Sequence, residues 1–102
     1  MSRTAEHVAA FNRAVTSGDW DAFAERFAVD ATMAFTGIPV GPFEGRTAIA
    51  AAYRENPPTE TMTLIDDGDD PARFRWSGGG TGSMELHWAP DGAVQVLIVS
   101  FD

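Results

Sequence analysis

The sequence predicts an α+β domain in which helices cover one face of an antiparallel sheet. Three observations support this class: two apolar stripes at helical spacing open the chain, a third helical stretch follows a loop rich in proline and glycine, and alternating segments close it. The expected order is helix, helix, strand, helix and four further strands. The 102 residues are enough for one hydrophobic core, so we expect a single domain, 1–102.

The first helix is expected at residues 5–17, with Thr4 as its N-cap and Gly18 just past its end. Its apolar stripe consists of Val8, Phe11 and Val15. Because His7 lies away from the centre of this stripe, we expect a histidine at the surface or at the edge of the core.

A second, shorter helix is expected after Asp19, whose side chain can cap it. The aromatic stripe of this helix consists of Trp20, Phe23 and Phe27. A tight turn at Asp30-Ala31-Thr32 is then expected to lead into the first strand, over residues 32–37.

Proline and glycine residues mark the next segment as a loop, with a minimal strand at 42–44. The third helix is expected at 46–55, because it follows Gly45 and is stopped by Asn56-Pro57-Pro58. Ile49 and Tyr53 are one turn apart and share its buried face.

The remaining strands are expected at 59–66, 73–77, 81–88 and 94–101. The last two flank Ala89-Pro90-Asp91-Gly92, a strong hairpin signal. A four-residue loop there predicts that Met84 pairs with Leu97 on an apolar face, and that Glu85 pairs with Val96 on the other face.

The charge balance narrows the range of partners. Fifteen acidic and seven basic residues give a net charge of −8, which disfavours nucleic acid and anionic membrane surfaces. The absence of cysteine excludes disulfides and thiolate chemistry, and His7 has no second ligand at metal spacing. We interpret the acidic run 66–70 as a solvated turn. No cofactor or metal is expected, and with no signal peptide at the N-terminus the expected location is cytoplasmic.

Two sequence segments, together with the distance between them, resemble those of a known family. The segments are AVTSGDWDAFAERFAVDATMAF and FEGRTAIAAAY. The chain resembles the nuclear transport factor 2-like superfamily, and within it the SnoaL-like and ketosteroid-isomerase-like branch. The resemblance is strong over residues 8–54 and rests on strand pattern after that. Since this fold hosts isomerases, cyclases, dehydratases, hydrolases and non-catalytic binders, it indicates a fold more than a reaction.

The resemblance implies a cone, formed by three helices on a curved antiparallel sheet, with an apolar pocket inside. The pocket wall that it implies consists of Phe11, Val15, Phe35, Tyr53, Met62, Phe74, Trp76, Met84 and Leu86.

The steroid isomerases of this branch use a carboxylate base and two acidic hydrogen-bond donors. When their pattern is aligned with this chain, the tyrosine donor corresponds to Phe11, the base to Phe35 and the carboxylic acid donor to Met84 or a residue near it. None of these side chains transfers a proton or donates a hydrogen bond. The resemblance therefore argues against ketosteroid isomerase activity by that mechanism.

Two polar candidates remain for catalysis. Tyr53 matches a tyrosine that reaches toward the pocket in the isomerase branch, although a core-edge aromatic is the simpler interpretation. His87 shares a sheet face with Glu85, which is the pattern of an acid–base pair, but the expected register places both on the outer face, where they would form a surface charge pair.

Three functions stay open. The first is a binder of a small hydrophobic ligand in an aromatic-lined pocket. The second is a SnoaL-like enzyme, an isomerase, cyclase or hydrolase that uses residues other than the missing triad. The third is a non-catalytic module that forms a homodimer through the outer sheet face, where Val94, Val96 and Ile98 are expected to make an apolar patch.

Overall fold

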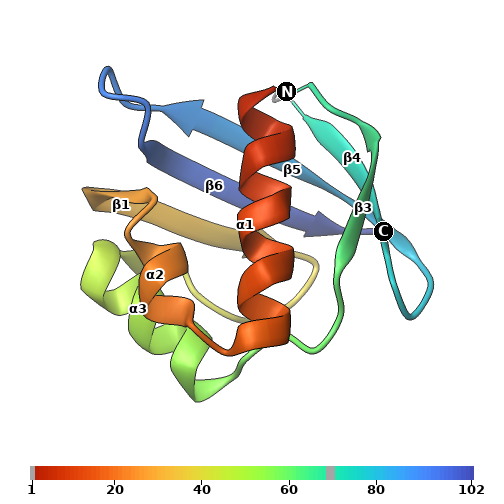
Figure 1. Cartoon of the computed structure of the whole chain (residues 1–102), viewed down its shortest axis with the longest axis horizontal. Coiled ribbons are helices and arrows are strands. Elements are labelled where there is room, and N and C mark those ends of the chain that lie inside the picture. Colours follow the sequence, from red (N-terminus) through yellow and green to blue (C-terminus); the bar gives the residue numbers. More distant parts are fainter. Residues whose placement is uncertain (1, 69–70) are drawn as a thin grey trace.

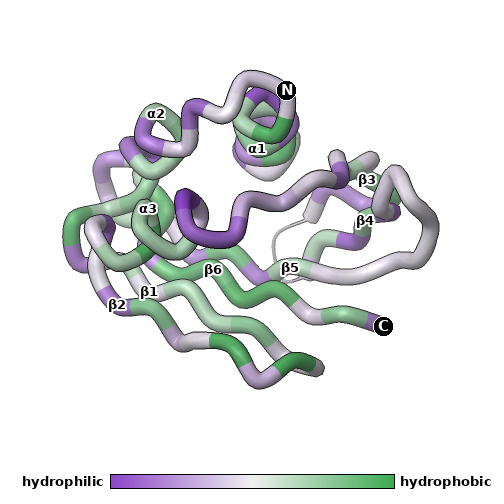
Figure 2. The backbone as a smooth tube through the Cα atoms, turned by 90° about the horizontal axis from the view of Figure 1, so that it is seen from below, coloured by the Kyte–Doolittle hydropathy of each residue, from purple (hydrophilic) through white to green (hydrophobic). Residues whose placement is uncertain are grey.

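The computed structural model describes residues 2–68 and 71–102, and its elements follow the predicted order (Figure 1). The helices are α1 (Arg3–Ser17), α2 (Trp20–Ala24) and α3 (Arg46–Glu55). The strands are β1 (Phe27–Thr36), β2 (Phe43–Glu44), β3 (Met62–Asp66), β4 (Ala72–Trp76), β5 (Thr81–Trp88) and β6 (Val94–Phe101). Figure 2 shows the helices gathered on one side of the sheet, which confirms the α+β class.

The six strands form one curved, unclosed sheet in the order β2-β1-β6-β5-β4-β3. The prediction of antiparallel pairing holds everywhere except between β1 and β6, which are parallel and make the sheet mixed. The parallel pair has a simple cause. The chain between these two strands contains α3 and three strands of the meander, and a crossover of that length can bring β6 back in the direction of β1.

The start of α1 differs from the prediction. Ser2, not Thr4, is the N-cap, because the Ser2 hydroxyl accepts a hydrogen bond from the Ala5 amide at 3.0 Å. Thr4 is buried inside the first turn, and its hydroxyl donates to the Gly68 carbonyl oxygen at 3.0 Å. The helix ends as predicted at Gly18, whose φ of +79° is the left-handed conformation that glycine adopts without strain.

The region after α1 is only partly as predicted. Asp19 caps α2 by accepting from the Ala22 amide at 3.1 Å. The helix is short, however, and Phe27 begins β1 instead of continuing the helical stripe. The predicted turn at 30–32 lies within β1, where the register against β6 shifts between Phe27 and Thr32. A shift of register absorbs the extra residues without breaking the strand.

The β5–β6 hairpin pairs two residues away from the predicted register. Met84 lies opposite Val99 and Glu85 opposite Ile98. One residue of this difference comes from the loop, since Trp88 pairs with Val94 and not with Ala93, and the other comes from the register shift between His87 and Trp88. Since side chains alternate with a period of two, this even displacement keeps each residue of β5 on its predicted face. On β6 the face of Val94 differs from the prediction, because Val94 is buried in the core and does not belong to the outer patch.

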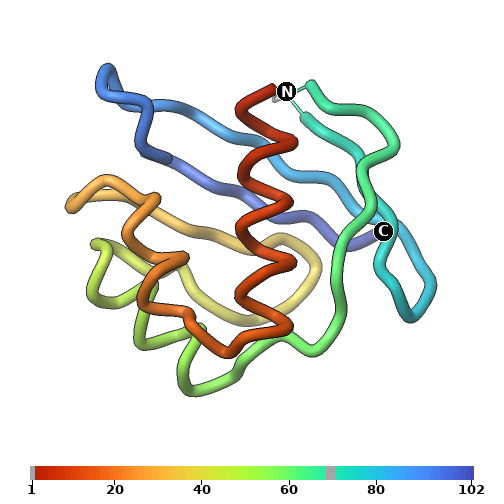
Figure 3. The backbone as a smooth tube through the Cα atoms, viewed as in Figure 1, coloured from red at the N-terminus to blue at the C-terminus, as the bar shows by residue number. Residues whose placement is uncertain are grey.

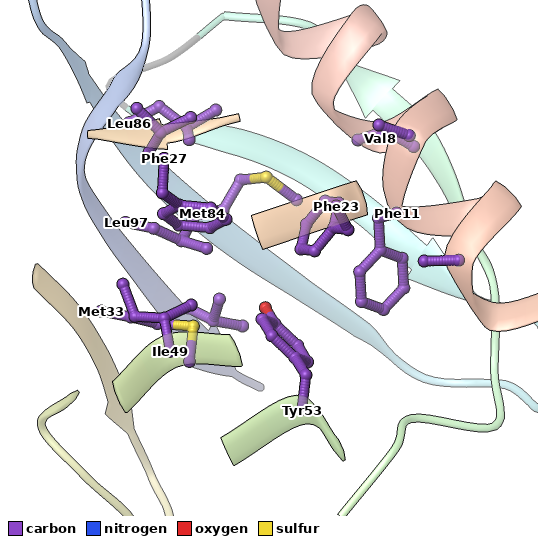
Figure 4. Packing of buried hydrophobic residues seen from close by; sticks show 14 of the residues in the cluster. Val8, Phe11, Phe23, Phe27, Met33, Ile49, Tyr53, Met84, Leu86 and Leu97 are labelled. Atoms are coloured by element: carbon purple, nitrogen blue, oxygen red, sulfur yellow. The ribbon is translucent and has the colours of Figure 1, made fainter. Parts of the chain in front are cut away.

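The core lies between the helices and the inner face of the sheet (Figure 4). A close contact in it explains one glycine. A Cβ at Gly82 would lie 2.8 Å from Cζ of Phe74 and 2.6 Å from the Ser100 carbonyl oxygen, so the Phe74 ring occupies the space above the strand. The expected face of α3 is confirmed, since Ile49 and Tyr53 are both buried.

Candidate ligand pocket

One end of the interior is hollow. A cavity of about 760 Å³ opens between the sheet, α1, α3 and two loops, 37–42 and 56–60. Its aromatic wall consists of Phe11, Phe35, Phe43, Tyr53, Trp76 and Phe101. This volume is in the range of pockets that hold small organic ligands, which are mostly apolar with a few placed polar groups.

The aromatic rings form a connected surface across the sheet. Phe101 stacks on Trp76 with centroids 5.9 Å apart and on Phe35 at 6.3 Å. Phe43 meets Phe35 edge to face at 6.4 Å, and Phe11 of α1 meets Trp76 at 6.3 Å. Each contact is in the range at which aromatic pairs attract each other, so the rings hold one another in place around the cavity.

The β1–β2 loop closes one side of the mouth with aliphatic side chains. Ile38 and Val40 line the cavity but remain 39% and 46% exposed. Exposed apolar side chains that gather at the mouth of a cavity are typical of a binding site.

The other side of the mouth is polar and firmly attached. Glu55, Asn56, Thr59 and Glu60 line it. The segment that carries Glu60 runs from α3 to β3, past the last turn of α1 (Figure 3). Hydrogen bonds join Thr61 to Ser77, and the Gly78 amide donates to Oε1 of Glu60. This side of the rim is therefore held by the β4–β5 hairpin.

Asn12 fixes the same rim from the helix side. Its Nδ2 donates to the Met62 carbonyl oxygen and its Oδ1 accepts from the Met62 amide, both at 2.8 Å. One side chain thus replaces a missing strand partner at the start of β3 and ties that strand to α1.

Five of the nine pocket residues expected from the sequence line the cavity, namely Phe11, Phe35, Tyr53, Met62 and Trp76. Phe74, Met84 and Leu86 are packed within the core, and Val15 packs at its edge, so these four do not line it. Sequence reasoning missed Phe43 and Phe101. The signal for Phe101 was its alternation with Val99, which places both on the inner face of β6.

Tyr53 lies where the cavity meets the core. Its ring stacks on Trp20 with centroids 4.7 Å apart and an interplanar angle of 6°. Figure 4 shows its hydroxyl directed into the buried cluster. Burial raises the pKa of this phenol well above its ordinary value, so Tyr53 stays neutral and can only donate or accept a hydrogen bond.

His87 and Glu85 lie on the opposite face of the sheet from the cavity. Nε2 of His87 is 2.8 Å from Oε2 of Glu85, and the two side chains are 55% and 37% exposed. The two catalytic candidates, Tyr53 and His87, are therefore not brought together by the fold.

His7 corrects a prediction, because its side chain is buried in the core and only 3% exposed. Its ring lies 5.3 Å from that of Phe23 and 6.0 Å from that of Phe27, and Nδ1 has no hydrogen-bond partner among the described residues. Burial, together with the positive charge of Arg26, lowers the pKa of His7 to about 3. The imidazole is therefore neutral near pH 7 and acts as a core aromatic.

Within residues 2–68 and 71–102, no three His, Asp or Glu side chains gather as they would around a metal ion. The end of the acidic run, Asp69 and Asp70, lies outside the described residues. No helix in the described part of the chain combines the length and apolar character needed to cross a membrane.

Comparison with known proteins gives a family and a fold. The model of a family described as "SnoaL-like domain" matches residues 8–101. A crystal structure of a SnoaL-like protein of unknown function from Burkholderia thailandensis superposes with a TM-score of 0.75. The two share 20% identity, and the match covers 98% of this chain and 94% of the other, so the likeness concerns the fold. No protein with a curated description matches the chain.

Proposed function

This chain belongs to the SnoaL-like family of the nuclear transport factor 2-like superfamily, and from that premise we propose that it binds a small hydrophobic ligand in its aromatic cavity. One observation carries the proposal: a space of about 760 Å³ stays open although large side chains surround it. The space opens to solvent and is lined mainly by aromatic and aliphatic side chains, and an apolar concave surface of this kind is where proteins usually bind small organic ligands.

The exposed side chains at the mouth support the same function. Ile38, Val40 and Phe101 keep between 37% and 46% of their surface in contact with solvent. A ligand that enters the cavity would remove part of this apolar surface from water, at roughly 25 cal/mol per Å². A module that only filled its interior with side chains has no use for this opening.

Binding is favoured over enolisation chemistry. Phe11 and Phe35 line the cavity at the places where the resemblance puts a donor and a base. Neither side chain moves a proton. For an enzyme of this family that uses other residues, Tyr53 is the catalytic candidate that touches the cavity, although its hydroxyl is directed into the buried cluster and would have to turn toward the cavity to donate a hydrogen bond.

A thermal-shift screen with apolar compounds tests the proposal. A ligand at 100 times its Kd stabilises the folded state by about 2.7 kcal/mol, which raises Tm by several degrees in a domain of this size. Ala52 lines the cavity from α3, so Ala52→Phe should place a ring inside the space and reduce the shift. Ala51→Phe, one residue earlier and outside the lining, is the matched control.

The result that contradicts the proposal is a broad panel without any shift, or a shift that Ala52→Phe leaves unchanged. Circular dichroism of both variants without ligand establishes that each is folded. Tyr53→Phe addresses the enzymatic alternative: if a substrate is found and this variant turns it over at the wild-type rate, Tyr53 has no catalytic role.

We also propose that two copies pair through the outer face of the sheet. Val96 and Ile98 lie on that face of β6, in the middle of the sheet, and the helices cover the other face. Light scattering tests the pairing: Ile98→Asp should convert a dimer into a monomer, and a monomeric wild type would contradict it. A cytoplasmic location stays a prediction from the sequence.

A further inference from the structure

The electrostatic character of the cavity narrows the class of its ligand. Resting on the proposed function, we propose that the ligand is a hydrophobic amine whose cationic end lies against the Glu60 carboxylate, and that the cavity rejects hydrophobic carboxylates. Three features support this assignment: the charges on the lining, the position of Glu60, and the helix end on the same cavity rim.

The charged groups on the lining are all acidic. Glu55 and Glu60 line the cavity, whereas none of the chain's seven basic residues, all arginines, is found among the described lining residues. Two arginines adjoin lining residues in sequence. Arg54, next to Glu55, forms an ion pair with Asp21, and Arg75, next to Trp76, is an exposed residue that alternates onto the other face of β4. A ligand carboxylate would therefore enter an apolar space without a cation to compensate its lost hydration.

Glu60 is held in place before any ligand arrives. Its Oε1 accepts the Gly78 amide, while Oε2 accepts no hydrogen bond from the described residues. A Cβ at Gly78 would lie 2.8 Å from the carboxyl carbon of Glu60, so only glycine allows the carboxylate to sit over this turn. The free oxygen of a half-buried, fixed carboxylate is a favourable acceptor for an ammonium group.

The surroundings of Glu60 also favour a positive charge. α3 ends at Glu55 on the cavity rim, and the carbonyl end of a helix carries a partial negative charge. The net charge of −8 raises the local concentration of cationic ligands further.

Three probes with the same chain length test the assignment: decylamine, decan-1-ol and decanoate. The two ionic probes are titrated below their micelle concentrations and the alcohol below its solubility limit, and binding is followed by calorimetry. We expect the amine to bind about tenfold tighter than the alcohol, and the carboxylate weaker than the alcohol. The preference for the amine should shrink in high salt, because the contact lies at a partly exposed rim.

Glu60→Gln tests whether the preference for the amine arises at Glu60. It should bring the Kd of the amine close to that of the alcohol and leave the alcohol unchanged. Glu85→Gln makes the same change of net charge on the outer face, so it should keep the full preference. This control separates a contact at Glu60 from a general attraction between cations and an acidic protein.

The outcomes distinguish the two proposals. If the alcohol binds and the amine binds no tighter, or if decanoate binds best, the amine assignment is wrong while the hydrophobic site stands. If Glu60→Gln keeps the preference, the cationic end does not lie at Glu60 and the amine assignment fails. If none of the three binds the wild type, both the hydrophobic site and the amine assignment are overturned.

Discussion

The inner face of the sheet has two ends that differ in how they are filled. At the packed end, around Phe27, Met84 and Leu86, the side chains are almost fully buried (Figure 4). At the open end Phe35 is half-buried and Phe101 is 37% exposed, and both face a cavity. Both ends are apolar and aromatic. Composition alone therefore does not explain why one is solid and the other hollow.

The difference lies in what covers each end. The packed end is closed by the first turns of α1 and by α2, whose residues His7 and Phe23 meet Phe27 through ring contacts. The open end is covered by two loops, 37–42 and 56–60, which carry prolines and glycines and few large side chains. A cavity thus arises where loops replace a helix as the lid of an apolar surface.

The largest expected effect contrasts one phenylalanine from each end. Phe27→Ala should destabilise the protein by about 3–5 kcal/mol, because it leaves a void in a fully packed site. Phe35→Ala should cost clearly less, since one side of its ring already faces the cavity. Chemical denaturation of both variants measures the two free energies of unfolding.

Ligand affinity should show the opposite order of effects for these two variants. Phe35→Ala should raise the Kd for a hydrophobic ligand, although it costs the fold less stability. Phe27→Ala should leave the Kd unchanged at temperatures where it is folded. Equal destabilisation by both variants would contradict the division into a packed and an open end.

Low pH should destabilise the packed end because of His7. Burial and Arg26 lower its folded pKa to about 3, while the ordinary value is 6.5. The unfolded state therefore binds the proton more readily, so this contribution to stability is complete above pH 6.5 and is lost as the pH falls toward 3. At pH 4 the loss should be on the order of 3 kcal/mol.

A matched variant isolates the histidine from the carboxylates, which also titrate in acid. His7→Leu keeps an apolar side chain at the site and removes the proton acceptor, so its free energy of unfolding should fall less between pH 6.5 and 4. Near neutral pH the variant should be about as stable as the wild type, since Nδ1 makes no hydrogen bond with the described residues that would be lost. Parallel pH profiles for the two proteins would contradict the assignment.

A smaller effect is expected at the rim of the open end, where Asn12 holds Met62. Asn12→Ala removes both hydrogen bonds and should cost about 1–2 kcal/mol. Asn12→Asp keeps an acceptor for the Met62 amide but sets a carboxylate oxygen against the Met62 carbonyl oxygen, so the repulsion between two acceptors should make it cost at least as much as Asn12→Ala. Hydrogen exchange at the Met62 amide, compared with an amide in β6, shows whether the loosening stays at the rim.

Most of the fold was predictable from the sequence, because local signals agree with the final structure. The third helix is an example: Gly45 before it, two prolines after it and an apolar face fix both of its ends at the predicted residues. β1 was harder. Its first residues look helical, and only pairing with β6, a contact distant in sequence, makes Phe27 the start of a strand.

The site was less predictable than the fold. The face of each β5 residue survived an error of register because the displacement was even, as for Met84. Which inner residues line a cavity depends on the lid above them, and alternation along a strand carries no information about that. The prediction for His7 was wrong for a related reason. The side of α1 that His7 occupies is covered by Phe23 and Phe27, which come later in the chain.

The smallest expected effect lies on the outer face, away from both ends. The contact of His87 with Glu85 is exposed, so a double-mutant cycle with His87→Ala and Glu85→Ala should give a coupling of only about 0.2–1 kcal/mol. His87→Ala should leave the Kd of a cavity ligand unchanged, because the sheet separates this side chain from the cavity. A variant that lost binding or activity while folded would instead show that the outer face takes part in function, and the contrast between packed and open ends would then describe only half of the working surface.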